Sequence, residues 1–365
     1  MKPTLLRPLR KLGKIFFHQP ETPTKPHAFS QTEEQKKSYG KAVLANGNSP
    51  TNFSINLGAA PCNHSCLFCP QSIEKPKKAV WLDLKILEKV LKEMPEENIL
   101  LNLSSYSETM TAPNLLPAVE LMKTVRPRLP IAMASNGSVI REDVMRELIR
   151  LGLDHNSFSF DAATRESYQR MMQKDDFDKV WRNLDRLVEI RAEMQSSIKL
   201  TTHIMGFKGQ EEAFERFKEY WAPKLDGVFW RRVGNWGGDY LGLEANLAKS
   251  GFVSDYKTPV DRVPCTSIFM HFKLGESGYY YPCTAAVPAS DTHLLEPMGH
   301  ANDITWTQAW ETLSDMRKAH IEGRWDSYER CRTCNLWSMW DDMWFEETKP
   351  DGSKHFFLKD VSHAL

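Results

Sequence analysis

The stretch FSINLGAAPCNHSCLFCP (residues 53–70) decides the architecture of this chain. Its apolar start, residues 53–57, predicts a short β-strand, and three cysteines at the spacing C-x3-C-x2-C follow directly. Three thiolates on one tight loop can hold three irons of a [4Fe–4S] cluster and leave the fourth iron open for a small molecule. The alternative is a zinc loop with His64 as fourth ligand, although no second pair of cysteines lies nearby in the sequence.

Downstream of this stretch, strand-like and helix-like segments alternate. Apolar runs predict strands at 53–57, 99–103, 130–134, 157–160, 198–204 and 228–233. Apolar residues at helical spacing predict helices at 84–94, 115–125, 141–151, 176–194 and 211–221. Strict alternation favours an α/β fold with a parallel sheet, and six units are too few for an eight-fold barrel. We therefore expect a partial (β/α)6 TIM-like barrel, with its functional loops at the carboxyl ends of the strands.

A change of character near residue 260 predicts a second, smaller domain. The glycine-rich segment 234–238 ends the alternation, and Pro259 and Pro264 mark a boundary. The segment that follows holds four of the seven cysteines and short strand-like pieces at 268–273 and 279–281. The expected division is a basic N-terminal arm at 1–48, the barrel at 49–260, a cysteine-rich domain at 261–345 and a C-terminal tail at 346–365.

Composition excludes several classes of protein. With 41% apolar and 26% charged residues in 365, the chain is an ordinary globular one. Lys+Arg and Asp+Glu are both 47, so no basic surplus supports nucleic-acid binding. No apolar run approaches the roughly 18 residues of a membrane span, and the N-terminus lacks the pattern of a secretory signal. Seven cysteines, three of them within eight residues, are a poor disulfide framework, which favours a reducing cytoplasm and metal ligation.

The first cysteine motif resembles that of the radical S-adenosylmethionine (SAM) superfamily, including the aromatic Phe68 before the last cysteine. The resemblance implies that Cys62, Cys66 and Cys69 bind a [4Fe–4S] cluster whose open iron is chelated by S-adenosylmethionine. In that family the cluster's electron cleaves the sulfonium. The resulting 5′-deoxyadenosyl radical abstracts a hydrogen atom from the substrate.

Other positions match the family one by one. Phe68 matches the aromatic whose backbone lies by the adenine. The family also has a Gly-Gly-Glu-like segment that holds the methionyl amino group, and of this segment only the glutamate is present here, as Glu108. Ser135 and Asn136 resemble a Thr-Asn-Gly segment near the cofactor, and Ser159 belongs to a segment resembling the Ser-x-Asp near the ribose. These five residues are the expected cofactor-binding set. Turn formation and helix capping are the alternative roles of Glu108, Ser135 and Asn136.

The remaining cysteines, Cys265, Cys283, Cys331 and Cys334, can close around a zinc ion or a second [4Fe–4S] cluster. Their sequence context, including the C-x2-C pair, resembles the C-terminal module of the SPASM/twitch branch. Full SPASM modules have more cysteines, so the resemblance is to the shorter twitch module with one auxiliary cluster. This resemblance implies an expected total of two [4Fe–4S] clusters.

Three plus four ligands use all seven cysteines, so no thiol is left to return a hydrogen atom to a substrate radical. This favours net oxidation, with the closed auxiliary cluster accepting an electron, as in the twitch-bearing dehydrogenases that the chain resembles. The expected substrate is a hydroxylated small molecule or sugar, and the expected reductant is a flavodoxin or ferredoxin. The alternatives are an epimerase or peptide-modifying radical SAM enzyme and a non-catalytic cluster- or zinc-binding protein.

The substrate cavity is expected to face the first cysteine motif. His203, which titrates near neutrality, is the candidate base, and Arg232 is the candidate to hold an alkoxide. The alternative for His203 is a satisfied histidine of the sheet. Further candidates at the same strand ends are Thr202, Arg231, Asn235 and Trp236.

Overall fold

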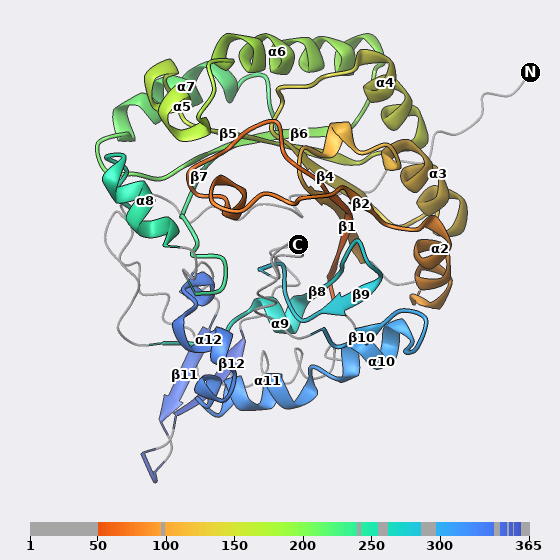
Figure 1. Cartoon of the computed structure of the whole chain (residues 1–365), viewed down its shortest axis with the longest axis vertical. Coiled ribbons are helices and arrows are strands. Elements are labelled where there is room, and N and C mark those ends of the chain that lie inside the picture. Colours follow the sequence, from red (N-terminus) through yellow and green to blue (C-terminus); the bar gives the residue numbers. More distant parts are fainter. Residues whose placement is uncertain are drawn as a thin grey trace, which may run out of the picture.

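Six parallel strands form the centre of the protein and curve into the predicted partial barrel (Figure 1). The computed structural model describes residues 50–95, 99–238, 242–254, 262–285, 297–338, 344–348, 350–352 and 354–358, so the arm expected at 1–48 lies outside the described residues. In spatial order the strands are β1 (Asn52–Ala59), β3 (Leu100–Tyr106), β4 (Ile131–Ser135), β5 (His155–Asp161), β6 (Lys199–Met205) and β7 (Gly227–Arg231).

Helices cover the outside of this sheet (Figure 1). They are α2 (Leu84–Glu93), α3 (Leu115–Val125), α4 (Glu142–Leu151), α5 (Arg165–Met172), α6 (Phe177–Glu193), α7 (Glu211–Trp221) and α8 (Leu243–Lys249). Helix α4 shows why they form, since Val144, Met145 and Leu148 make one buried stripe on it. It ends at Gly152, whose φ of 92° lies in the left-handed region, a conformation that glycine adopts easily because it has no Cβ. Among the described residues, no helix is long and apolar enough to cross a membrane.

The strands present different chemistry to their two faces. On β1, Phe53, Ile55 and Leu57 are fully buried in the apolar core, whereas Ser54 and Asn56 point to the opposite face. Because helices cover the outer face, the alternate residues line the interior of the barrel. Polar side chains such as these therefore face the interior of the barrel.

The cysteine-rich C-terminal segment extends the same sheet. Strand β8 (His271–Leu274) pairs in parallel with β1, and β9 (Tyr279–Tyr281) and β10 (Gly299–His300) continue antiparallel from it. The rings of Phe53 and Phe272 lie 4.7 Å apart across the β1–β8 pair. The strand predicted at 268–273 is wrong at its start, because α9 (Ser267–Met270) forms a helical turn before β8. The helices of this segment are α10 (Trp306–Glu311), α11 (Ser314–Ile321) and α12 (Glu329–Thr333).

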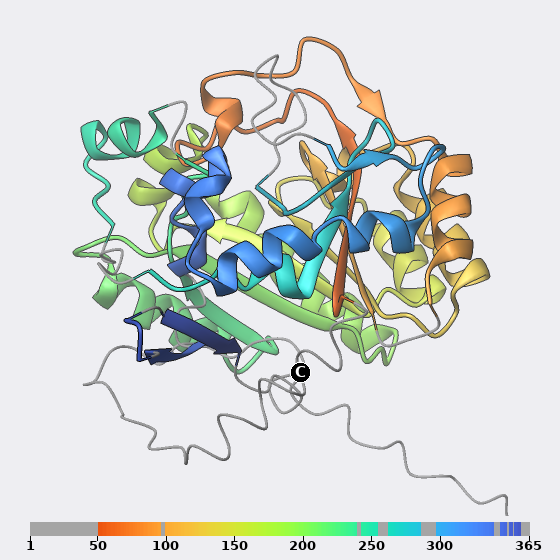
Figure 2. The same ribbon diagram turned by 90° about the horizontal axis from the view of Figure 1, so that it is seen from below.

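A two-stranded hairpin, β11 (Trp344–Thr348) with β12 (Lys354–Leu358), lies where the sequence predicted a tail from residue 346 (Figure 2). Trp344 anchors it, because its indole N–H donates to Thr266 Oγ1 at 3.0 Å and its ring packs on Phe269. The remaining short elements are η1 (Pro70–Ser72), β2 (Val80–Trp81), η2 (Thr109–Thr111) and η3 (Trp325–Ser327).

Candidate active site

The first cysteine loop, residues 60–70, follows β1 at the carboxyl edge of the sheet. The side chain of Gln71 shapes it: the N–H of Cys62 donates to Gln71 Oε1 at 2.8 Å, and Gln71 Nε2 donates to the carbonyl of Ala60 at 3.1 Å. A turn closes the loop where the N–H of Cys69 donates to the carbonyl of Cys66 at 2.8 Å. The three predicted cluster ligands therefore lie on one tightly held turn.

Helices α5 and α6 hold the other side of this loop. The N–H of Leu67 donates to the carbonyl of Met171 at 2.9 Å. His64 is buried, and its Nε2 lies 3.1 Å from Asp176 Oδ2, while the Tyr168 hydroxyl donates to the other oxygen of Asp176 at 2.9 Å. One imidazole nitrogen of His64, the fourth ligand of the zinc alternative, is thus engaged with Asp176.

The three thiols of the loop form a donor set suited to a cationic metal group. All seven cysteines are free of disulfides. Burial raises the pKa of Cys62, and it raises the pKa of Cys69 to about 12. Burial and the neighbouring thiols raise the pKa of Cys66 well above its usual value. Buried thiols that disfavour one another's charge are protonated until a cation binds and displaces their protons, which fits an iron–sulfur cluster.

The second cysteine group, Cys265, Cys283, Cys331 and Cys334, comes from segments far apart in the sequence. Burial raises the pKa of Cys265 most, and the charges of the other three thiols raise it further, so the four side chains are neighbours. Burial and two of the same thiols raise the pKa of Cys331 to about 12. The described residues hold no set of three or more His, Cys, Asp or Glu side chains arranged around a single metal ion. As a set of soft thiol donors, the group fits an iron–sulfur cluster.

Three residues of the expected cofactor set form one hydrogen-bonded group. The buried carboxylate of Glu108 accepts from Ser135 Oγ at 2.7 Å and from the backbone N–H of Asn136 at 2.7 Å. It also accepts from the N–H of Met110 at 2.9 Å and so caps η2. Burial nevertheless raises the pKa of Glu108, and no cation among the described residues forms an ion pair with it. Asn136 joins the group to the cysteine loop, since its Nδ2 donates to Asn63 Oδ1 at 2.9 Å.

Phe68 and Ser159 lie apart from that group. The carbonyl of Phe68 accepts a hydrogen bond from the indole N–H of Trp236 at 2.7 Å. Ser159 is half-buried on β5 and pairs in register with His203 on β6, so both residues belong to the same side of the sheet.

The interior of the barrel carries a charged cluster of which the sequence predicted only part. His203 is buried, and its Nε2 lies 3.3 Å from Asp161 Oδ1. Burial and the charge of Arg231 lower the pKa of His203, while Asp161 opposes this effect. Arg231 remains accessible to solvent although surrounding protein lowers its pKa, which is consistent with a side chain inside a concave interior. Asp161 is the acid of the Ser-x-Asp-like segment found in the sequence, but it was not among the predicted site residues.

The predicted Arg232 has a different environment from Arg231. Its guanidinium donates to the carbonyl of Ser338 in the C-terminal segment. Neighbouring residues of a strand point to opposite faces, so Arg231, in register with Met205 of β6, takes the interior position.

A second polar group, not predicted from the sequence, lies on β8 and the turn after it. Lys273 and Glu276 are buried, and Asn56 Nδ2 donates to Glu276 Oε2 at 2.7 Å. Burial lowers the pKa of Lys273, and the carboxylate of Glu276 opposes this effect. Only the pairing of β8 with β1 brings these side chains to the barrel.

An open cavity of about 390 Å³ lies beside the second cysteine group. Its lining includes Cys334, Arg262, Arg332 and the paired amides Asn235 and Asn335.

Comparison with known proteins agrees with this geometry. Residues 60–220 match the family described as the Radical SAM superfamily. The PqqA peptide cyclase of Gluconobacter oxydans is 26% identical over 296 residues, which are 75% of this chain and 79% of the cyclase. An uncharacterized protein, MJ0804, of Methanocaldococcus jannaschii is 26% identical over 151 residues, 41% of this chain, and the match spans about half (47%) of that protein's own length.

Solved structures share the fold. BtrN in complex with AdoMet and 2-DOIA aligns with a TM-score of 0.52 and 18% identity, over 79% of this chain and 93% of BtrN. Streptococcus suis SuiB aligns with a TM-score of 0.55 and 11% identity, over 82% of this chain and 75% of SuiB. The fold that these structures share with this chain is a TIM-like partial barrel, the fold of the radical SAM family that residues 60–220 match.

Proposed function

Because residues 60–220 are a radical SAM domain, we propose that this protein is a radical SAM oxidoreductase that dehydrogenates a hydroxylated small molecule or sugar. One observation carries the proposal: the seven cysteines fall into a loop of three and a group of four, and none remains to donate a hydrogen atom. A substrate radical without a thiol donor is better suited to lose an electron than to regain hydrogen. The seven uncrosslinked thiols also support a reducing cytoplasm as the compartment.

In this proposal Cys62, Cys66 and Cys69 hold the first [4Fe–4S] cluster, and the second cysteine group holds an auxiliary [4Fe–4S] cluster. When bound, the first cluster with S-adenosylmethionine supplies a 5′-deoxyadenosyl radical that takes a hydrogen atom, and the second supplies an acceptor for one electron.

Glu108 is the proposed partner of the cofactor's ammonium group. Its carboxylate is buried among three neutral donors, and its raised pKa shows that these do not fully offset burial of the charge. A carboxylate offers about four acceptor positions, so one remains for a further donor. A cationic ligand satisfies both the charge and the free position. Ser135 and Asn136 then act through Glu108 by fixing its orientation. Phe68 and Ser159 remain proposed contacts of the adenosine part.

His203 is the proposed base. Its lowered pKa keeps the imidazole neutral at pH 7, and its Nε2 lies 3.3 Å from Asp161 Oδ1. That contact favours the tautomer with hydrogen on Nε2, which leaves the buried Nδ1 as a proton acceptor. Dehydrogenation balances when the substrate carbon loses a hydrogen atom, the hydroxyl gives its proton to His203 and one electron leaves, so that a C=O bond forms.

Arg231 is proposed to bind the substrate oxygen in place of Arg232. Its guanidinium belongs to the polar interior and acts on His203, so a cation is present where negative charge develops on the substrate oxygen. Arg232, predicted as catalytic from the sequence, is proposed instead to hold the C-terminal segment through Ser338.

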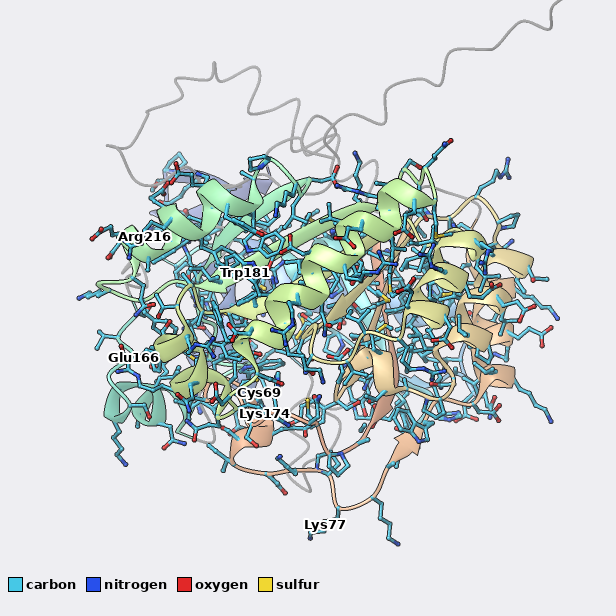
Figure 3. All side chains as sticks on the ribbon, turned by 90° about the horizontal axis from the view of Figure 1, so that it is seen from above. Cys69, Lys77, Glu166, Lys174, Trp181 and Arg216 are labelled. Carbon is cyan, nitrogen blue, oxygen red and sulfur yellow. The ribbon has the colours of Figure 1, made fainter. Side chains whose placement is uncertain are left out.

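An acidic electron carrier, such as a flavodoxin or ferredoxin, is the proposed reductant. In a chain with no net charge, three exposed lysines follow the first cysteine loop in the sequence and a fourth contacts it from the segment after α5: Lys75, Lys77, Lys78 and Lys174. Lys174 Nζ donates to the carbonyl of Asn63 at 3.0 Å, and Lys75 Nζ lies 3.5 Å from the carbonyl of Cys62. Figure 3 shows Lys77 projecting from the loop between η1 and β2. Such a patch attracts an acidic partner to the place where an electron has to enter.

Modification of a peptide is the second candidate. The match to a peptide cyclase over 75% of this chain favours it, and the accessible side chains of Ala134 and Arg231 leave the interior open to a larger substrate.

Turnover in heavy water separates the candidates. Dehydrogenation gives a ketone or aldehyde two mass units lighter than the substrate, formed one-to-one with 5′-deoxyadenosine and without solvent deuterium on the attacked carbon. A product of unchanged mass in ordinary water that gains one deuterium in heavy water shows epimerisation. A peptide product with a new internal bond shows cross-linking. Either of these two results overturns the dehydrogenase proposal.

A further inference from the structure

Asn235 and Trp236, in the glycine-rich segment after β7, lie between the two groups of cysteines. The indole N–H of Trp236 donates to the carbonyl of Phe68 at 2.7 Å, and Asn235 Nδ2 donates to the carbonyl of Thr333 at 3.0 Å. Each carbonyl belongs to the residue directly before a cysteine, Cys69 in one case and the last cysteine of the second group in the other. Two adjacent residues therefore connect the backbones of both sites.

The end of this connection at the second cysteine group is held by several hydrogen bonds. The N–H of Asn235 donates to Asn335 Oδ1 at 2.8 Å, and the N–H of Asn335 donates to Asn235 Oδ1 at 3.1 Å. The same Oδ1 of Asn235 accepts from the N–H of Gly238 at 3.1 Å. Arg330 Nη1 adds a bond of 2.9 Å to the carbonyl of Gly237. A reciprocal amide pair of this kind fixes both backbones rather than one.

The backbone conformation also shows that the direction of the indole is held in place. Trp236 has a φ of 52°, in the left-handed region that bulky residues rarely adopt. Gly238 has a φ of 119°, and a Cβ there would lie 2.5 Å from Thr333 Oγ1. An unfavourable backbone angle such as that of Trp236 persists where the surrounding structure imposes it.

We propose that Asn235 and Trp236 form a positioning bridge through which metal loading of the second cysteine group orders the first cysteine loop. The inference rests on the proposed function in one respect: the first cysteine loop and the second cysteine group are both taken as metal sites. Metal bound at the second group restricts Thr333 and Asn335, and the bridge carries that restriction to Phe68. Because such coupling is reciprocal, order in the first loop favours loading of the second group equally.

The test isolates one site. With Cys62, Cys66 and Cys69 changed together to Ala, anaerobic reconstitution loads the second group alone, and an iron assay verifies about four irons per chain. Hydrogen–deuterium exchange then follows the peptide 67–73 with and without iron. We expect loading to slow exchange there roughly two- to ten-fold, the range that one net hydrogen bond supports.

Two variants in this background decide the result. Trp236→Phe keeps an aromatic ring and removes the N–H donor, so loading is expected to change exchange less than two-fold. Trp230→Phe, a control on the preceding strand β7 whose ring packs on Phe214, is expected to keep the full effect. If Trp236→Phe does not fold, Asn235→Asp replaces it. This variant keeps the Oδ1 acceptor and replaces the donor to Thr333 by a carboxylate oxygen that repels the carbonyl, so it breaks the bridge at its other end.

The two possible failures differ in what they show. Equal protection with and without the bridge, or no protection in iron-loaded protein, overturns the bridge alone. Failure of the second group to bind iron overturns the auxiliary-cluster assignment, and the bridge with it.

Discussion

Changing Ser135 to Ala tests whether the hydrogen-bonded group around Glu108 is built as described. The Ser135 hydroxyl donates to the Glu108 carboxylate at 2.7 Å and accepts from the N–H of Gly137 at 3.0 Å. Ser135→Ala removes a hydrogen bond to a charged group, worth about 1.5–3 kcal/mol, and leaves a buried N–H unpaired at a cost of about 1–3 kcal/mol. Since the two losses share one hydroxyl, they are not additive, and we expect about 2–4 kcal/mol in total.

The matched control is Ser105→Ala on β3. The Ser105 hydroxyl is buried and has no partner among the described residues, so its removal is expected to change stability by less than about 0.5 kcal/mol. The assay is urea unfolding of the full chain under reducing, anaerobic conditions. A Ser135→Ala variant as stable as Ser105→Ala would refute the assigned hydrogen bonds.

The pH dependence provides a second readout of the same variant. Burial raises the pKa of Glu108, and the Ser135 hydrogen bond lowers it, so Ser135→Ala raises it further. A raised carboxyl pKa destabilises the folded state as pH rises through that pKa. The stability difference between wild type and Ser135→Ala should therefore be larger at pH 7 than at pH 5. A difference that grows on acidification would contradict a charged Glu108.

Three further predictions concern other parts of the protein. Changing Cys331 and Cys334 to Ala should abolish substrate oxidation and spare some cleavage of S-adenosylmethionine, and oxidation by a folded variant would remove the electron-transfer role of the second group. The double variant Lys77→Glu/Lys78→Glu should bind an acidic flavodoxin, and be reduced by it, at least about ten-fold less well, while dithionite-driven cleavage of S-adenosylmethionine stays unchanged. Equal losses with both reductants would show that the lysines act on the cluster itself. Burial lowers the pKa of His155 to about 4, so the unfolded chain binds an extra proton below pH 6.5. Between pH 7 and pH 5, the wild type should therefore lose about 2 kcal/mol more stability than His155→Gln. Equal losses in the two proteins would contradict a neutral buried imidazole.

The barrel was predictable from the sequence because its signals are local. The predicted helix at 115–125 has the observed bounds of α3, and the predicted strand at 198–204 differs from β6 by one residue at each end. Alternation between helical and strand periods already specifies a parallel sheet. The pairing of β8 with β1 joins segments about 220 residues apart and leaves no local pattern. The sequence therefore predicted a C-terminal segment of different character, but not that its strands continue the sheet of the barrel.

The candidate site divides in the same way. The cysteine motifs and Glu108 stand out by residue type and spacing. Arg231 and Arg232 are neighbours of identical chemistry, and only the register of β7 with β6 decides which one lies inside the barrel. Asp161 stands in the Ser-x-Asp-like segment, but only the pairing of β5 with β6 brings it to His203, and Lys273 required the β1–β8 pairing. Side-chain parity and distant pairing are the two properties that residue type does not encode.

The most direct test of the central claim is the formation of 5′-deoxyadenosine by the anaerobically reconstituted full chain with S-adenosylmethionine and dithionite. We predict that the wild-type chain forms it and that the variant with Cys62, Cys66 and Cys69 changed to Ala does not. Wild-type protein that holds iron yet releases no more 5′-deoxyadenosine than this variant would contradict the radical SAM activity proposed here.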